Sequence, residues 1–209
     1  LVMRIKELVA EDRIDPIPIY IDSPLASRAT EVFRQHPECY DEETYRTFTE
    51  DGDPFASRYI RFVSSPDDSK RLNAMKGPMI IISSSGMCEG GRVLHHLKHA
   101  IEDEANVIVF VGFQAEHTLG RKLVEGWDVV PIFGVPTKRR AQVVKFNGLS
   151  AHADRNDLLA YVRAINPLPS KVFIVHGEEK RALSLGEAIK SEHSSIDVTI
   201  PHRGSSHEI

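Results

Sequence analysis

Short runs of β-branched residues alternate with amphipathic helical windows along most of this 209-residue chain. Strands that are joined by helical crossovers are typically parallel, and several of these runs are apolar throughout, as in strands that are covered on both faces. The predicted strands are Ile17–Ile21, Tyr59–Val63, Met79–Ser83, Val107–Val111, Ala141–Phe146, Val172–Val175 and Ile196–Ile200. The alternation predicts an α/β fold with a parallel-type sheet flanked by helices.

The predicted helices begin at recognisable capping sequences. Ser23 followed by Pro24 has the pattern of an N-cap with proline at the first helical position, and Asp154 with Asp157 has the pattern of a capping box. No capping residue precedes the apolar helical pattern that starts at Val2, so we expect the chain to start inside a helix. The other predicted helices are Pro24–Gln35, Gly91–Ile101, Thr118–Glu125, Asp154–Ile165 and Glu179–Ser191.

Two stretches interrupt the alternation. Residues 36–78 are polar and turn-rich, and we expect a helix, a loop and a short strand there. Residues 126–140 contain Gly126, Gly134 and Pro136 and have the composition of a connection between two units. We therefore predict two domains, residues 1–137 and residues 138–209.

Composition limits the classes of function. The net charge of −4 and the pI of about 6.2 lack the basic footprint of a nucleic-acid-binding protein, so any such contact must be local. Cys39 and Cys88 have no CxxC spacing, which argues against a disulfide framework and a thiolate zinc site and indicates a cytoplasmic location. No apolar run reaches the roughly 20 residues of a membrane-spanning helix, so we expect no membrane partner.

Two histidines lie just beyond predicted strands, where α/β folds place their chemistry. His152 precedes a helix that begins at Asp154. His176 ends a strand and is followed by Gly177 and Glu178, a setting that suits a metal ligand with a carboxylate to orient its ring. A purely structural role stays open for each histidine, and two histidines do not complete a zinc site, which needs three or four donors.

The turn after Met79–Ser83 is dominated by small residues. Ser85, Gly86 and Met87 precede a helix that starts near Arg92, so backbone N–H groups and a guanidinium could bind an anion there. The turn is neither a Walker A loop nor a GxGxxG loop, which favours a nucleic-acid phosphate over a nucleotide cofactor. An ordinary strand-to-helix turn is the alternative.

A similar turn with Gln114, Thr118 and Arg121 follows the next predicted strand. We expect the two turns to lie side by side at one edge of a parallel sheet, with Ser23 at the same edge, as a phosphate-contacting surface. On the helix between the two turns, His95 and His99 have the i, i+4 spacing of a metal-binding helix. The glutamate that this motif needs is replaced by a third histidine, His96, so we favour a structural or interfacial role. The basic run at residues 138–140 is expected to be a solvated face.

Taken in order, these segments resemble the β-CASP ribonucleases of the metallo-β-lactamase superfamily over nearly the whole chain. The segment Ser150-Ala151-His152-Ala153-Asp154 resembles motif B of the family, and Val175-His176-Gly177-Glu178 resembles motif C. Residues 19–26, 85–87 and 112–121 resemble the β-CASP module in order and separation. The Ser-Ser-Gly-Met turn places the chain nearer the pre-mRNA 3′-end processing endonucleases than RNase J.

The resemblance implies zinc-dependent hydrolysis of RNA phosphodiester bonds by the full-length protein, with two Zn²⁺ ions and RNA as the partner. His176 would ligate one zinc, and His152 would contact the scissile phosphate as general acid or transition-state stabiliser. Ser150, Asp154 and Glu178 would support these two histidines. A homodimer is left open.

The family's His-x-His-x-Asp-His signature does not occur in these 209 residues. Residues 1–137 would then be the β-CASP domain, and residues 138–209 the C-terminal segment of an αββα metallo-β-lactamase domain. We therefore expect this chain alone neither to hold two zinc ions nor to cleave RNA.

Three alternatives stay open. The first is a DNA nuclease of the same superfamily, and the second is a non-catalytic RNA-binding scaffold, against which the retention of His152 and His176 argues. The third is a doubly wound α/β domain that binds a phosphorylated small molecule. Salt-dependent binding to oligonucleotides would count against the third.

Overall fold

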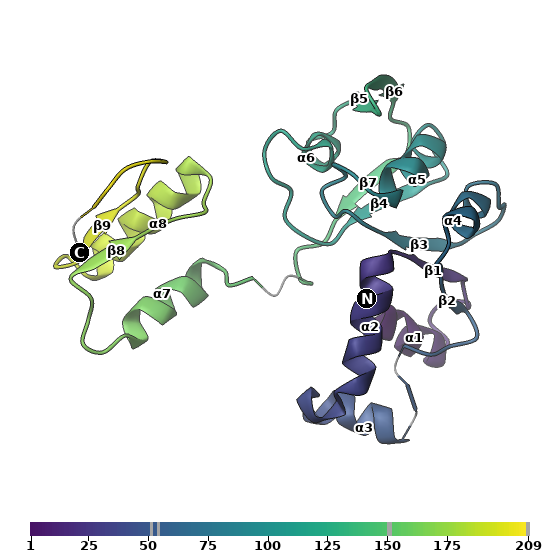
Figure 1. The fold of residues 1–209 in the computed structure, drawn as a ribbon, viewed down its shortest axis with the longest axis horizontal. Coiled ribbons are helices and arrows are strands. Elements are labelled where there is room, and N and C mark those ends of the chain that lie inside the picture. Colours follow the sequence, from purple (N-terminus) through teal and green to yellow (C-terminus); the bar gives the residue numbers. More distant parts are fainter. Residues whose placement is uncertain (51, 54, 150–151, 208–209) are drawn as a thin grey trace. The chain divides into compact units, whose positions relative to one another are not determined.

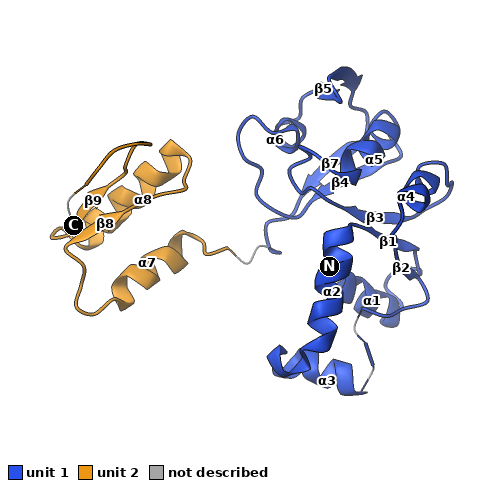
Figure 2. Ribbon diagram, in the orientation of Figure 1, with its two compact units in different colours: residues 1–150 blue, residues 151–209 orange. Residues whose placement is uncertain are grey.

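The computed structural model describes residues 1–50, 52–53, 55–149 and 152–207. It forms two compact units, residues 1–150 and 151–209, which are coloured separately in Figure 2. The predicted α/β class is confirmed. No helix in the described ranges is long and apolar enough to cross a membrane.

The first half of unit 1 is a three-stranded parallel sheet in the order β2-β1-β3 (Figure 1). Its strands are β1 (Ile19–Asp22), β2 (Ile60–Phe62) and β3 (Ile80–Ser83). Successive side chains of β1 point to opposite faces of the sheet, so they pack in two different hydrophobic clusters. Ile19 and Ile21 pack with residues of α1 (Val2–Ala10) and α2 (Pro24–Gln35), whereas Tyr20 packs with Leu72 of α4 (Pro66–Leu72).

The polar stretch 36–78 contains more helix than we predicted. It holds the short 3-10 turn η1 (Pro37–Cys39), α3 (Glu42–Glu50) and α4. The start of α4 has the same signal as the start of α2, because Ser65 caps the helix and Pro66 occupies its first turn. Aromatic rings join α2 to the following turn, since Phe33 stacks on Tyr40 with 4.5 Å between ring centroids.

The second half of unit 1 is a separate two-stranded parallel sheet of β4 (Val107–Phe110) and β7 (Gln142–Lys145). Two helices, α5 (Arg92–Ala100) and α6 (Leu119–Val124), contribute Leu97 and Leu123 to its core. The expectation that β3 and β4 share one sheet is wrong. Each is four residues long and pairs along its whole length with a different strand, β3 with β1 and β4 with β7.

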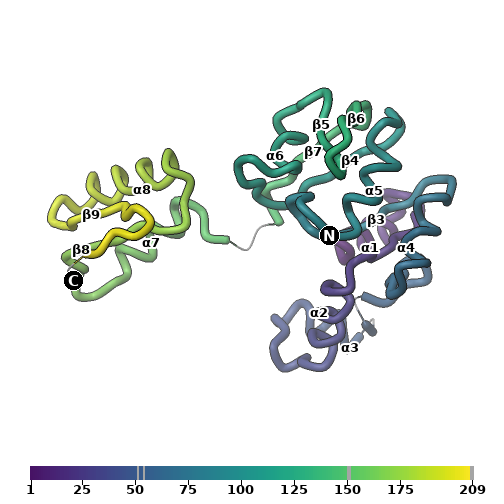
Figure 3. Tube along the Cα trace, turned by 45° about the horizontal axis from the view of Figure 1, so that its top comes forward, coloured from purple at the N-terminus to yellow at the C-terminus, as the bar shows by residue number. Residues whose placement is uncertain are grey.

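The stretch 126–140, predicted as a connection, forms an antiparallel hairpin of β5 (Val129–Ile132) and β6 (Val135–Lys138). Phe133 and Gly134 turn the chain with φ of 51° and 76°, as a two-residue hairpin turn requires. Val130 and Ile132 point into the core, which explains the alternation of burial along β5. Figure 3 follows the chain from β4 through α6 and this hairpin to β7, so the chain continues in unit 1 beyond the predicted boundary at 137.

Unit 2 has a small α/β fold. Its strands β8 (Lys171–Phe173) and β9 (Asp197–Thr199) pair in parallel, and they pack with α7 (Arg155–Ala164) and α8 (Glu179–Glu192) through a core that includes Leu159 and Ile189. Arg163 joins the two helices by donating two hydrogen bonds, of 2.8 and 2.7 Å, to the Glu192 carboxylate.

Candidate nucleic-acid interface

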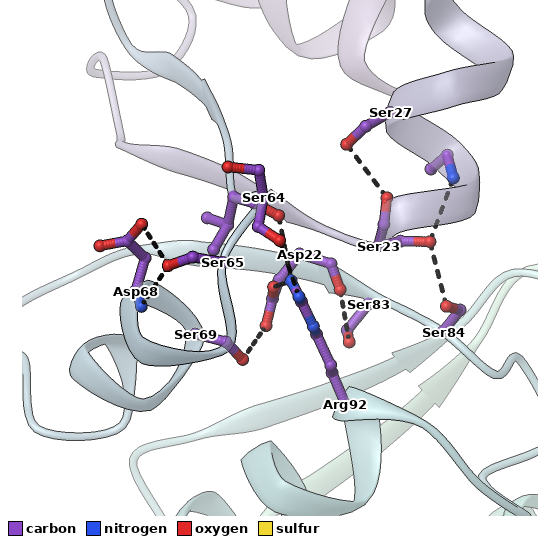
Figure 4. Close-up of polar contacts among 12 residues, drawn as sticks. Asp22, Ser23, Ser27, Ser64, Ser65, Asp68, Ser69, Ser83, Ser84 and Arg92 are labelled. Atoms are coloured by element: carbon purple, nitrogen blue, oxygen red, sulfur yellow. Dashed lines mark hydrogen bonds and ion pairs between the residues drawn. The ribbon is translucent and has the colours of Figure 1, made fainter.

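A buried carboxylate lies at the carboxyl end of β1. Asp22 has no exposed surface. Its Oδ2 accepts hydrogen bonds from Ser69 Oγ and His96 Nε2, both at 2.6 Å, and its Oδ1 accepts one from Arg92 Nη1 at 2.5 Å. Figure 4 shows the Ser69 and Arg92 side chains converging on this carboxylate from α4 and from the start of α5. Asp22 thus joins three elements that are far apart in the sequence.

Arg92 is held inside the fold by this network. Besides its ion pair with Asp22, it donates hydrogen bonds of 3.0 Å to the carbonyl oxygens of Val63 and Ser64 (Figure 4). Its side chain is 18% exposed. The predicted phosphate contact of Arg92 would have to compete with these three acceptors.

His96 has the structural role that the sequence favoured. Its Nδ1 lies 2.8 Å from Asn73 Oδ1, and its Nε2 faces Asp22. The ring of its neighbour His95 packs against Phe133 in the hairpin turn, at 4.9 Å between centroids. Neither histidine belongs to a metal-binding cluster in the described part of the chain.

The stability of this network should depend on pH. Burial by itself raises the pKa of Asp22, but hydrogen bonds from Ser69, His96 and Arg92 outweigh it and hold the pKa below its ordinary value of 3.8. A carboxyl whose pKa is lowered by folding stabilises the fold above its unfolded pKa and loses that effect as pH falls. We expect the free energy of unfolding to fall as the pH drops below about 4 and through the folded pKa of Asp22. Urea titrations at pH 7, 5, 4 and 3 on wild type and Asp22→Asn test this, and parallel pH curves for the two proteins would contradict it.

Ser23 follows Asp22 and caps α2. Its Oγ accepts a 3.2 Å hydrogen bond from the Ala26 N–H and lies 3.0 Å from Ser84 Oγ, which begins the turn after β3 (Figure 4). The prediction that Ser23 lies at the same edge as this turn is therefore confirmed. Its predicted RNA contact stays a prediction.

The two turns that we expected to be neighbours are joined by Gln114. This residue is only 3% exposed, and its Nε2 lies within 3.0 Å of both the Gly86 and Phe113 carbonyl oxygens. Turn 84–91 and turn 112–118 thus lie side by side, although their preceding strands belong to different sheets. Gln114 is a support between the turns, and its burial leaves little of it for a direct RNA contact.

Groups within the fold already bind the start of α6. Thr118 Oγ1 accepts from the Arg121 N–H, Glu89 Oε1 accepts from the Leu119 N–H at 2.6 Å, and the Met87 carbonyl accepts from the Gly120 N–H at 2.9 Å. Thr118 is consequently a helix cap, and an incoming phosphate would have to displace Glu89. Arg121 itself donates to Glu125 at 2.6 Å.

The exposed surface of the two turns differs from the predicted one. Gly86 and Met87 are exposed, Met87 to 36%, whereas the side-chain oxygen of Ser85 is buried without a hydrogen-bond partner. Phe113 is 41% exposed and His117 is also exposed. We did not predict Phe113 and His117 at this surface, although an aromatic residue that directly follows an apolar strand and a glycine is a detectable signal.

His152 lies on the surface of unit 2, two residues before the N-cap of α7. The predicted capping box is confirmed, because Asp154 Oδ1 accepts from the N–H of Asp157 while Asp157 Oδ2 accepts from that of Asp154. Asp154 thus holds the start of the helix. Ser150 lies outside the described residues.

His176 lies three residues beyond β8 and is exposed. Its backbone is in the left-handed region, with φ of 64°, and this conformation turns the chain between β8 and α8. Glu178 is the N-cap residue of α8, and its Oε2 accepts a 3.1 Å hydrogen bond from Arg181 Nε.

The donors for a complete zinc site are missing from the described residues. None of the described His, Cys, Asp and Glu side chains form a group of three or more that could hold a metal ion. Burial raises the pKa of the Cys88 thiol to about 11, which disfavours the thiolate that zinc requires. His152 and His176 therefore do not belong to a whole metal site within the described residues.

Comparison with known families decides the relationship. The Beta-Casp domain family matches residues 1–123. The chain belongs to the Beta-Casp family. Residues 137–201 also match the family described as the Zn-dependent metallo-hydrolase RNA specificity domain. The resemblance to β-CASP proteins is thereby confirmed.

Curated relatives extend this family assignment. The chain is 36% identical to ribonuclease TTHA0252 of Thermus thermophilus over 186 residues, which are 88% of this chain and 42% of the relative. It is 36% identical to transcription termination factor FttA of Methanocaldococcus jannaschii over 83% of this chain and 28% of the relative. For FttA of Methanosarcina mazei the identity is 31%, over 88% and 30%. The chain thus spans less than half the length of these relatives.

Proposed function

We propose that this chain is part of a longer protein that hydrolyses RNA phosphodiester bonds with zinc. The observation that carries the proposal is the match of residues 137–201, which contain His152 and His176, to the Zn-dependent metallo-hydrolase RNA specificity domain. A relative of 36% identity is named a ribonuclease. The relatives named transcription termination factor favour a second candidate, a role in ending transcription.

His176 is proposed as one zinc donor and His152 as the group that contacts the scissile phosphate. Both side chains are exposed, so they are accessible to a partner domain and a substrate. Two histidines do not hold a zinc ion by themselves, so the other donors must come from outside the described residues. Ser150, Asp154 and Glu178 are proposed to support the two histidines.

The paired turns 84–91 and 112–118 are proposed as the RNA-contacting surface of unit 1. Of the residues predicted for this surface, Gly86 and Met87 are exposed, and Arg121 is half-buried and paired with Glu125. The side chains of Ser23, Gln114 and Thr118 act mainly by fixing the turns. Arg92 acts in the same way, because its guanidinium is already bound to Asp22. Ser85 does so through its backbone, because its N–H donates to the Gly90 carbonyl and its carbonyl accepts from the Cys88 N–H, both at 3.1 Å.

The domain division at 137 is kept as a proposal about the longer protein. Residues 1–137 would be the β-CASP domain, and residues 138–209 would complete a metallo-β-lactamase domain. In support of this division, the RNA specificity family match begins at residue 137.

Binding to a single-stranded RNA oligonucleotide tests the proposal against a small-molecule phosphate site. We expect the 209-residue chain to bind the oligonucleotide, and its affinity to fall about sevenfold between roughly 50 and 200 mM salt if two phosphates are contacted. A DNA oligonucleotide of the same sequence tests sugar preference. Salt-independent affinity, or no binding to either strand, would contradict the proposal.

A further inference from the structure

Two exposed apolar side chains stand on the paired turns. Phe113 of turn 112–118 is 41% exposed, and Met87 of turn 84–91 is 36% exposed. Gly86 beside Met87 is exposed as well. A partly exposed aromatic ring and a partly exposed thioether on adjacent turns are candidates for contact with a flat apolar group.

The backbones that carry these side chains are fixed relative to one another. The carbonyl oxygens of Gly86 and Phe113 both lie 3.0 Å from Gln114 Nε2, so they are within about 6 Å of each other. The Gly120 N–H binds the Met87 carbonyl, and Glu89 binds the Leu119 N–H. A contact surface that is already rigid loses little entropy when a ligand binds.

The chemistry of this surface favours a nucleobase. The two arginines nearest in sequence to the turns are occupied, Arg92 by Asp22 and Arg121 by Glu125, so little strong positive charge is available. Bases of single-stranded RNA stack on aromatic side chains irrespective of their sequence. We propose that Phe113, with Met87 on the neighbouring turn, is a stacking contact for a base of single-stranded RNA, an inference that rests on the proposed function.

Paired oligonucleotides test this contact in the full 209-residue chain. One is an ordinary single-stranded RNA, and the other is an abasic strand with the same backbone. Phe113→Ala should weaken binding of the ordinary RNA about tenfold and leave binding of the abasic strand unchanged. Phe113→Tyr should restore the affinity, because a phenol ring also stacks. Phe133→Ala removes a ring that is 50% exposed on the hairpin and should change neither affinity.

Each other outcome has a distinct meaning. Equal loss of affinity for both strands in Phe113→Ala would overturn the stacking contact, because a distorted turn harms backbone binding as well. Unchanged affinity of Phe113→Ala for ordinary RNA would also overturn the stacking contact. A protein would then be the partner to test for the exposed Phe113 ring. If the wild-type chain bound neither strand, the proposed function would fail, and this inference would fail with it.

Discussion

Replacing Asp22 with alanine should lower the free energy of unfolding of unit 1 by about 3 kcal/mol. Removing one partner of a buried ion pair leaves the other charge without compensation, which typically costs about 3–5 kcal/mol. The lower end applies because Arg92 remains 18% exposed and keeps its hydrogen bonds to two carbonyl oxygens. Ser69 and His96 would each lose an acceptor as well.

Urea denaturation followed by circular dichroism and by fluorescence of Trp127, the single tryptophan, measures this loss. Asp67→Ala is the matched control, because Asp67 is 78% exposed and forms a surface ion pair with Lys70 at 3.2 Å. That variant should change stability by no more than about 1 kcal/mol. Equal effects of the two substitutions would show that the Asp22 network does not stabilise unit 1.

Replacing Gly91 with alanine should cost about 2–4 kcal/mol. Gly91 precedes α5 with φ of 81° and ψ of −171°, a conformation that is essentially restricted to glycine and costs another residue about 1–3 kcal/mol. An added Cβ would also lie 2.5 Å from the Ser84 carbonyl oxygen. That oxygen accepts a 3.1 Å hydrogen bond from the Val93 N–H, so moving it would break this contact to the first turn of α5.

The neighbouring glycine gives the control for this substitution. A Cβ at Gly90 would meet nothing within 4 Å, and its φ is not positive. Gly90→Ala should therefore change the free energy of unfolding by less than about 0.5 kcal/mol. If Gly91→Ala were as stable as Gly90→Ala in the same urea titration, neither the positive φ of Gly91 nor its approach to Ser84 would restrict this position to glycine.

Local signals located most of the elements, and their success follows from capping chemistry. The predicted helix Pro24–Gln35 is observed with the same bounds, because Ser23 and Pro24 mark its start. The same pair, Ser65 and Pro66, marks α4 in a stretch that we predicted mainly as loop. The hairpin at residues 129–138 was missed because its turn uses Phe133-Gly134 rather than a common turn pair such as Asn-Gly.

Long-range contacts account for what the sequence could not predict about the site. Within its own turn, Arg92 follows small residues and glycines, which is a pattern that suggests a phosphate ligand. Its acceptor, Asp22, lies 70 residues earlier in the chain, and no local pattern connects the two. Gln114 is similar, because a polar residue in a glycine-containing turn suggests exposure, yet it is buried between two turns. The side-by-side placement of the turns was predictable, whereas which of their side chains are exposed was not.

Incubation of the 209-residue chain with radiolabelled single-stranded RNA and added Zn²⁺, with and without EDTA, tests the central claim most directly. We propose that this chain carries an RNA-contacting surface and two active-site histidines, and its described residues hold no complete metal site. We therefore expect that the RNA is bound, that binding weakens with salt, and that the strand stays intact at every zinc concentration. EDTA-sensitive cleavage of the RNA by these 209 residues would contradict it.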